Sequence, residues 1–165
     1  TDKNIIEEAV SQYTSLCALK LRKQKSCATR VNVFLQTNPH RLQDKQYMSA
    51  ITIDLPVATN ITSELIKYAK KAFSIIYSDG HNFMKCGVMM LDIIPEDQIQ
   101  FGMFDREDRS KQKIMMNALD KLNASFGKDL VRFASQGYEK KYKLKAAYLS
   151  KRCSTHIDEL ITINL

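Results

Sequence analysis

The sequence predicts an α+β fold: an antiparallel sheet covered on one face by two helices, followed by a small, mostly helical C-terminal extension. Two segments, 4–24 and 61–77, place apolar residues at helical spacing. Three others, 27–36, 47–55 and 83–93, have the composition and alternation of strands. This order allows a single sheet to bury its apolar rows beneath both helices.

Each predicted helix has signals at its ends. The segment 4–24 has acidic residues near its start and basic residues near its end, and we interpret the basic end as complementing the helix dipole. The segment 61–77 follows Asn60 and contains Thr62, either of which can cap its first turn. Both segments are therefore predicted to be amphipathic helices with one buried stripe.

The first two strands alternate between apolar and polar residues, so one face of each is expected to be buried. Pro56 is expected to end the second strand, because proline supplies no N–H group to a ladder. The residues predicted to face the helices are Val31, Val33, Leu35, Ile51, Ile53 and Leu55. A sheet of this kind normally has a fourth strand before its first helix, so we expect the chain to begin just after one, as a piece of a longer protein.

The rest of the chain divides into a linker and an extension. We place a sheet domain at 1–95, a polar linker at 96–110 and the extension at 111–165. Residues 111–126 return to helical spacing, and Leu130–Ala134 is a candidate short strand. The helical stripe of this segment consists of Ile114, Met115, Ala118, Leu119, Leu122 and Phe126.

Composition narrows the class of protein. The 165 residues include 25 Lys+Arg and 18 Asp+Glu, and the net charge of +7 permits a polyanionic partner without requiring one. A hydrophobic share of 44% excludes general disorder. No apolar run approaches the ~18 residues of a membrane helix, and the N-terminus does not resemble a signal peptide. We therefore expect a cytoplasmic protein with reduced cysteines.

No catalytic or metal-binding constellation emerges from the residue spacing. The four cysteines are isolated, and no pair has the C-x-x-C spacing of zinc ligands. The three histidines have no carboxylate or thiol at ligand spacing. We expect no metal site and no catalytic residue in this chain.

Several ordered motifs resemble one family. VFLQTNPHR (Val33–Arg41), ITIDLPVATNITSELIKYAKKAF (Ile51–Phe73) and KCGVMMLDIIP (Lys85–Pro95) resemble the little-finger domain of bacterial UmuC-type Y-family DNA polymerases. Ile114–Ser135 and Ser150–Leu160 resemble the C-terminal extension of the same subfamily. The resemblance departs from the family pattern near the end of the chain, where SKRCST replaces Ser-Pro-Arg-Tyr-Thr-Thr and Ile157 replaces a Trp.

The resemblance implies a parent protein that is an error-prone translesion DNA polymerase of the SOS response to DNA damage. The family active site lies in a palm domain upstream, where metal-binding carboxylates hold Mg²⁺. This chain contains no such motif, so no cofactor is expected here and the chain alone should be catalytically inactive.

The resemblance also implies contact with primer-template DNA. Residues that alternate with the buried row should face outward, where Lys and Arg can meet phosphates without reading base sequence. An ordinary solvated polar surface is the alternative interpretation. The predicted DNA-contacting residues are Arg30, Asn32, Thr37, Asn38, Arg41, Lys45 and Lys85.

A second predicted site is Gln100-Phe101-Gly102-Met103-Phe104, which resembles the sliding-clamp-binding peptide of bacterial polymerases. Adjacent apolar side chains, Met103 and Phe104, can enter a preformed pocket while Gln100 fixes the register. The alternative is that these apolar side chains dock on the core of this chain.

The basic segment Glu139–Lys145 can bind nucleic acid through charge and stacking, or remain solvated. The family resemblance adds UmuD-like and RecA-like proteins as possible partners. Two further hypotheses compete with a polymerase fragment, namely a stand-alone αβ module for RNA binding or protein interaction, and a small independent enzyme. The strands lack the Gly-Phe-x-Phe pattern of RNA-binding sheets.

Overall fold

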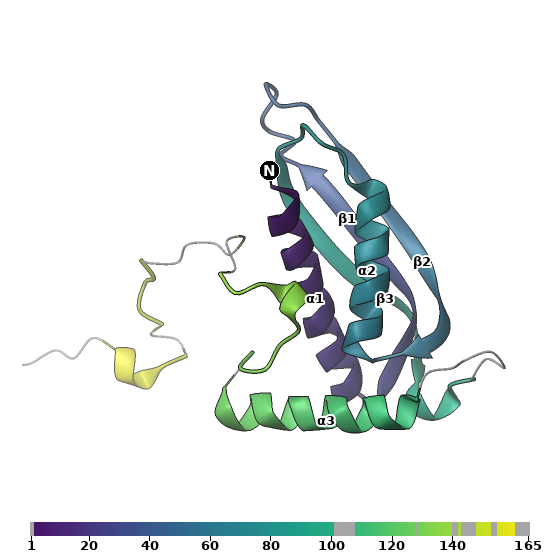
Figure 1. Ribbon diagram of the computed structural model, residues 1–165. Coiled ribbons are helices and arrows are strands. Elements are labelled where there is room, and N and C mark those ends of the chain that lie inside the picture. The colour runs from purple at the N-terminus through teal and green to yellow at the C-terminus, as the bar shows by residue number, and fades with distance from the viewer. Residues whose placement is uncertain are drawn as a thin grey trace, which may run out of the picture.

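The computed structural model describes residues 2–100, 108–127, 129–139, 142, 148–152 and 155–160. Its elements are α1 Lys3–Lys23, β1 Ser26–Thr37, β2 Met48–Thr59, α2 Thr62–Ile76, β3 Phe83–Pro95, η1 Glu96–Gln98, α3 Arg109–Phe126, η2 Ala134–Gln136 and η3 Ile157–Glu159. The three strands form one antiparallel sheet in the order β2-β1-β3. Helices α1 and α2 cover one face of it, and α3 lies across one end of this layer (Figure 1). The predicted fold class is confirmed.

The core lies between the sheet and its two covering helices. The inward row of the central strand, Val31, Val33 and Leu35, is fully buried. Leu65 and Phe73 of α2 pack into the same cluster. Alternation along a strand sends neighbouring side chains to opposite faces, so burial of this row leaves the other row on the face without helices.

Strand β2 does not end at Pro56, contrary to the prediction. It continues to Thr59. The register with β1 shifts here, because Arg30 pairs with Asp54 while Ala28 pairs with Thr59. Pro56 therefore lies in an irregular stretch where a missing N–H group costs no ladder hydrogen bond.

The first turn of α2 is not capped by Asn60 or Thr62, and that prediction was wrong. The capping position is Ile61, which has no side-chain hydrogen bond of this kind. The Thr59 hydroxyl accepts a hydrogen bond from the Ile61 N–H group at 3.2 Å instead. Thr62 and Asn60 are occupied elsewhere, since the Thr62 hydroxyl and the Asn60 carbonyl both accept hydrogen bonds from Arg22.

Arg22 fastens the extension to the sheet domain. Its guanidinium donates to both carboxylate oxygens of Asp120 in α3, at 2.7 and 2.8 Å. Only 9% of the Arg22 side chain is exposed, against 23% for Asp120. Arg109, at the start of α3, pairs with Glu64 at 3.1 Å. The basic end of α1 thus binds a specific partner as well as complementing the helix dipole.

The returning segment of the extension covers a polar side of α1. Gln136 is buried, and its amide donates to the Gln12 side chain at 2.8 Å. Gln12 in turn donates to Asp129 at 3.2 Å. Ser11 and Thr14 on α1 are buried too, and each hydroxyl donates to a carbonyl one turn earlier in the helix. Helix α1 is therefore enclosed on more than its apolar stripe.

The predicted strand Leu130–Ala134 is not formed, since the structure has no strand within residues 129–139. Val131 donates its N–H group to the Asn123 side chain and accepts from it through its carbonyl, both at 2.8 Å. A side-chain amide therefore satisfies the backbone groups that a strand neighbour would have bonded.

Helix α3 agrees with its predicted span but turns its apolar stripe outward. Met116 is the one residue of this helix that is fully buried. Ile114, Leu122 and Phe126 are 70%, 43% and 71% exposed. The helix docks through Met116 and through polar and charged side chains on another side, so its predicted stripe is not part of the core.

Candidate functional site

The face of the sheet without helices has the polar row that the sequence predicts. Cross-strand partners point to the same face, so Gln36 of β1 shares this face with Lys85 of β3 and Met48 of β2. Met48 is 75% exposed and Met89 47% exposed. None of the described parts of the extension seals this face.

Exposed cations gather at one end of the face. Lys85 lies opposite Gln36, next to the point where β1 leads into the loop 38–47. Arg41 and Lys45 are exposed on that loop. The structure therefore brings Lys85 and the two loop cations to the same end of the sheet.

The loop 38–47 is held in shape by its own hydrogen bonds. The side-chain amide of Gln46 donates to the carbonyls of Asn38, Arg41 and Asp44. The Asn38 side chain accepts from the N–H group of His40 at 3.0 Å, as in an Asx turn. Such bonding limits the conformations of the loop and keeps its cations near the end of the sheet.

Thr37 lies at the base of this loop and is only 1% exposed. Its hydroxyl accepts from the N–H group of Tyr47 at 3.0 Å and lies within hydrogen-bond distance of the Gln46 side chain. This predicted contact residue therefore positions the loop from inside the structure.

Arg30 lies toward the other end of the face, six residues or about 20 Å along β1 from Gln36. Asp54 and Asp92 flank it, with nitrogen-to-oxygen distances of 2.7 and 3.1 Å. All three side chains are at least half exposed. Two carboxylates beside one guanidinium leave no local excess of positive charge. Arg30 is thus separated from the other predicted cations in position and in electrostatics.

The middle of the face has uncharged side chains. Phe34 lies opposite Gly87 of β3, and its ring occupies the space where a side chain at Gly87 would begin. Asn32, one row away, donates to the Thr52 hydroxyl at 2.9 Å, and its side-chain oxygen is buried without a partner among the described residues. The face thus runs from a neutralised Arg30 through an uncharged centre to a basic end.

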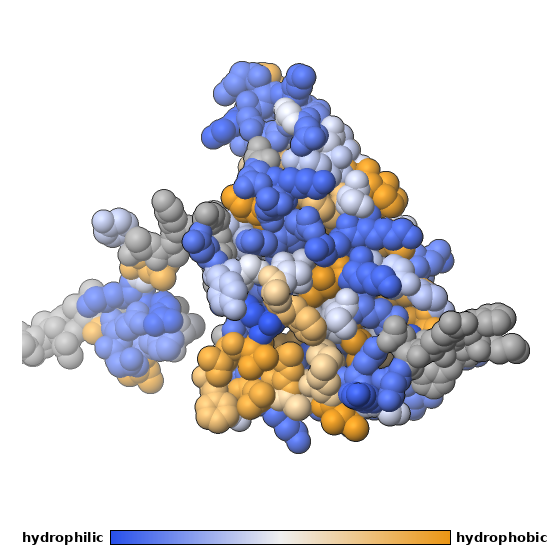
Figure 2. Space-filling view, in the orientation of Figure 1, coloured by the Kyte–Doolittle hydropathy of each residue, from blue (hydrophilic) through white to orange (hydrophobic). Residues whose placement is uncertain are grey.

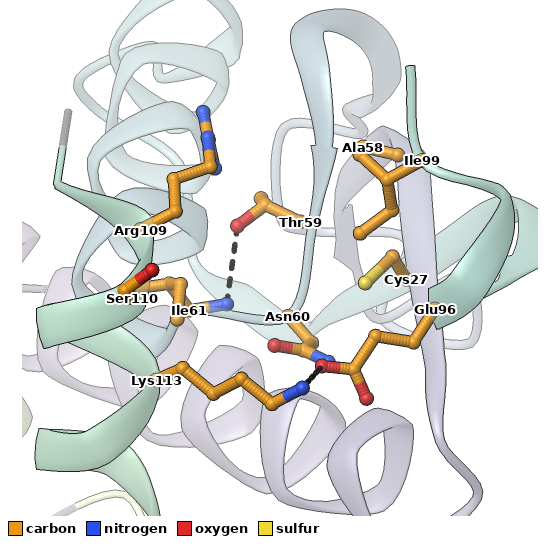
Figure 3. A pocket seen from close by; sticks show the side chains of 10 residues that line it. All are labelled: Cys27, Ala58, Thr59, Asn60, Ile61, Glu96, Ile99, Arg109, Ser110 and Lys113. Atoms are coloured by element: carbon orange, nitrogen blue, oxygen red, sulfur yellow. Dashed lines mark hydrogen bonds and ion pairs between the residues drawn. The ribbon is translucent and has the colours of Figure 1, made fainter. Parts of the chain in front are cut away.

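A small cavity of about 170 Å³ lies where β3 ends and α3 begins (Figure 3). Lys113 and Glu96 form an ion pair at 2.7 Å on one side of it. Cys27 also lines the cavity, beside Glu96, and is 1% exposed (Figure 3). Burial raises the pKa of Cys27 to about 11, so this thiol stays protonated at neutral pH and is a poor nucleophile.

Among the described residues there is no group of three His, Cys, Asp or Glu side chains placed to hold a metal ion. In that same part of the chain, no helix has an apolar stretch long enough to cross a membrane.

The predicted clamp-binding peptide falls largely outside the described residues. Gln100 is exposed, directly after η1. Met103 and Phe104 lie in the part that the structure does not describe. The helix that follows, α3, begins at Arg109. The preceding residue, Asp108, caps it, because its side chain accepts a hydrogen bond from the N–H group of Lys111 at 3.0 Å.

The basic segment of the extension is described only in part. Tyr142 packs edge-on against Tyr13 of α1, with ring centroids 6.0 Å apart. Desolvation raises the pKa of Tyr142 to about 12. The lysines of this segment lie outside the described residues.

Comparison with known proteins agrees with this geometry. A family model described as the impB/mucB/samB family C-terminal domain matches residues 1–103. The chain belongs to this family. A second model, a domain of unknown function named DUF4113, matches residues 113–163. The chain therefore combines the little-finger domain of UmuC-type Y-family polymerases with the extension of that subfamily.

Curated relatives match nearly the whole chain. Protein ImpB of Salmonella typhimurium is 33% identical over 94% of this chain and 37% of its own length. Protein UmuC of Salmonella typhimurium strain LT2 is 30% identical over 99% of this chain and 39% of its own length. Protein MucB of Escherichia coli is 29% identical over 91% of this chain. The chain thus spans less than two fifths of the length of these relatives.

Proposed function

We propose that this chain grips primer-template DNA for an error-prone translesion polymerase of which it forms the C-terminal part. The observation that supports this most directly is the sheet face left open by α1 and α2, with Lys85, Arg41 and Lys45 gathered at one end. Cations on a flat surface and a short loop meet phosphates without reading bases. Such tolerance suits a polymerase that moves along any template.

The basic end is the part of the face that contributes most to binding in this proposal. Arg41 and Lys85 have no counterion among the described residues, whereas Arg30 is already matched by two carboxylates. Lysine and arginine side chains that neutralise DNA phosphates release the cations condensed on the DNA. In this proposal, that release depends mainly on the cations of the loop 38–47 and on Lys85. Asn32 and Asn38 would add neutral contacts, with Thr37 supporting the loop.

The test replaces Arg41 and Lys85 with Glu and measures binding to a fluorescent primer-template by anisotropy over a range of salt concentrations. We expect affinity at low salt to fall by roughly tenfold or more, with a shallower salt dependence. Lys67→Glu with Lys71→Glu on the exposed side of α2 is the matched control, with the same charge change. Equal losses in both double variants would show a general charge effect and contradict the proposal.

We also propose that Gln100, Met103 and Phe104 bind a bacterial sliding clamp, as the family resemblance implies. The support is the position of the peptide between η1 and the capped start of α3, with Gln100 exposed. Met103→Ala with Phe104→Ala should abolish binding to the cognate clamp in surface plasmon resonance. Phe101→Ala is the control within the same peptide and should retain binding. Unchanged affinity of the double variant would remove this assignment.

The polymerase chemistry is proposed to reside in the parent protein outside this chain, where family carboxylates would hold Mg²⁺. Purified chain supplied with Mg²⁺, nucleotides and primer-template should give no primer extension above background on a denaturing gel, and robust synthesis would contradict this. UmuD-like and RecA-like proteins are further proposed partners on the basis of family membership.

A further inference from the structure

A groove of about 480 Å³ lies on the side of the molecule that the DNA-binding proposal does not use. The C-terminal halves of α1 and α3 form two of its walls, and residues 129–136 form the third. Figure 1 shows how this arises, since α3 passes across the end of α1 and the chain then returns beside α1. The apolar residues that line it are Leu16, Leu19, Leu119, Val131 and Phe133.

The apolar surface of the groove is accessible and continues beyond it. Leu16 and Val131 are 43% and 41% exposed. The outward stripe of α3 adjoins them, with Leu122 and Phe126 at 43% and 71% exposure. Figure 2 shows a cluster of apolar side chains over this end of α3. Contiguous exposed apolar surface around a concave centre is typical of a site that receives apolar side chains from another protein segment.

The charged residues around the groove leave a positive excess. Lys20 and Lys23 line it, are exposed, and form no ion pair with another described residue. The neighbouring Arg22 and Asp120 neutralise each other. Arg132, on the returning segment, lies over the ring of Tyr138 at 4.7 Å, and Asp129 of the same segment offsets its charge, so the excess comes from Lys20 and Lys23. An occupant with apolar anchors and acidic flanks would complement both properties.

We propose that this groove binds an acidic amphipathic segment, helical when bound, from a partner protein. Charge argues against two other occupants. The segment 140–147 of this chain contains four lysines and would be repelled by Lys20 and Lys23. A second copy would bring the same two lysines to the interface. The proposal goes beyond DNA and clamp binding, and it gives the extension a role of its own in forming two walls of a protein-binding site.

The test uses the complete chain and three fluorescent peptides of equal length. The first has Leu at helical spacing with Glu on its flanks, the second has Lys for Glu, and the third has Ser for Leu. We expect the first to bind with a dissociation constant in the micromolar range, and the other two at least tenfold more weakly. Lys20→Glu with Lys23→Glu should weaken the first peptide at least tenfold and favour the second. Equal binding of acidic and basic peptides would overturn the proposal.

Two controls test whether the peptide binds in the groove and not elsewhere on the surface. Lys67→Glu with Lys71→Glu on α2 should leave peptide affinity unchanged, and NMR shift changes should centre on Leu16, Leu119 and Val131 rather than on Leu42 of the distant loop. The variant that combines Arg41→Glu with Lys85→Glu should bind the peptide as tightly as the wild-type chain does. Loss of DNA binding and loss of peptide binding are therefore measured independently, and either proposal can fail without the other.

Other occupants appear as separate outcomes that would overturn the proposal. Competition by short duplex DNA would assign the groove to nucleic acid. A dimer in sedimentation velocity that Leu16→Glu dissociates would assign it to a second copy. Acidic peptide binding that appears only after removal of residues 161–165 would assign it to the end of this chain.

Discussion

Gly87 and Phe34 show how one residue shapes the open face of the sheet. A Cβ atom at Gly87 would clash with the Phe34 ring, because it would lie only 2.3 Å from the ring's Cε1 atom. The ring therefore lies across the sheet because β3 has no side chain at this position. Sequence alternation placed Phe34 on this face, but only the strand register places Gly87 beside it.

Gly87→Ala should lower the free energy of unfolding by about 1–2 kcal/mol, because the added methyl group displaces the Phe34 ring. The measurement is urea denaturation followed by circular dichroism. In a Phe34→Ala background the same change should cost less than about 0.5 kcal/mol, since the clash is gone. An equal cost in both backgrounds would mean that the backbone, and not the ring, resists the methyl group.

The thiols of Cys27 and Cys86 make the free energy of unfolding depend on pH in the alkaline range. Burial raises the pKa of each to about 11, above the value of 9.0 for an unperturbed cysteine. The unfolded chain therefore releases these protons at lower pH than the folded chain, and stability falls as pH rises from about 9 to 11.

Replacing both cysteines with Ala should flatten this decline. We expect wild-type protein to lose on the order of 2 kcal/mol more than the double variant between pH 9 and 11. Urea denaturation at several pH values measures the difference. Parallel pH profiles for the two proteins would show that other groups cause the alkaline loss.

At the scale of elements, α3 is held by charge rather than by its apolar stripe. Arg22 is buried against Asp120, Asn60 and Thr62, and Arg109 pairs with Glu64 close by. A buried guanidinium that loses its carboxylate retains its desolvation cost without the compensating attraction. These contacts explain how a helix with an exposed apolar face remains docked.

Asp120→Asn should lower the free energy of unfolding by about 1–3 kcal/mol, a range that allows for the partial exposure of this pair. Asp54→Asn, which breaks an ion pair with Arg30 on the solvent-exposed sheet face, should change it by less than about 1 kcal/mol. Denaturant titration of both variants provides the comparison. If Asp54→Asn cost as much as Asp120→Asn, burial would not explain the strength of the α3 contact.

At the scale of the whole molecule, the main hydrophobic cluster lies in the sheet domain. Its buried members run from Ile6 to Ile76, and the partly buried residues packed against them end at Met90. The extension adds a polar layer over Gln12 and a basic, apolar groove, but none of its described residues belongs to this core cluster. The fold therefore places the proposed DNA contact and the proposed peptide contact on different sides of one core.

A fragment ending at Gln100 should keep the sheet domain folded. We expect a cooperative unfolding transition, with NMR shift differences from the complete chain centred on the residues that contact the extension, which are Gln12 and Tyr13 of α1, Arg22, Glu64 and Glu96. Loss of cooperative unfolding would mean that the extension is part of the folding unit. The same fragment should lose the acidic peptide site, because α3 and residues 129–136 form two of its walls.

Local periodicity in the sequence determined helices α1, α2 and α3, the three strands of the sheet and which row of β1 is buried, because a period of two or 3.6 residues directly sets which side chains share a face. The ordered motifs likewise determined the family. The tertiary structure alone decided that the α3 stripe points outward, that Arg22 is buried against a residue 98 positions away, and that Arg30 is neutralised while Lys85 joins the loop cations. Those outcomes depend on which distant elements meet, and no local period encodes such contacts.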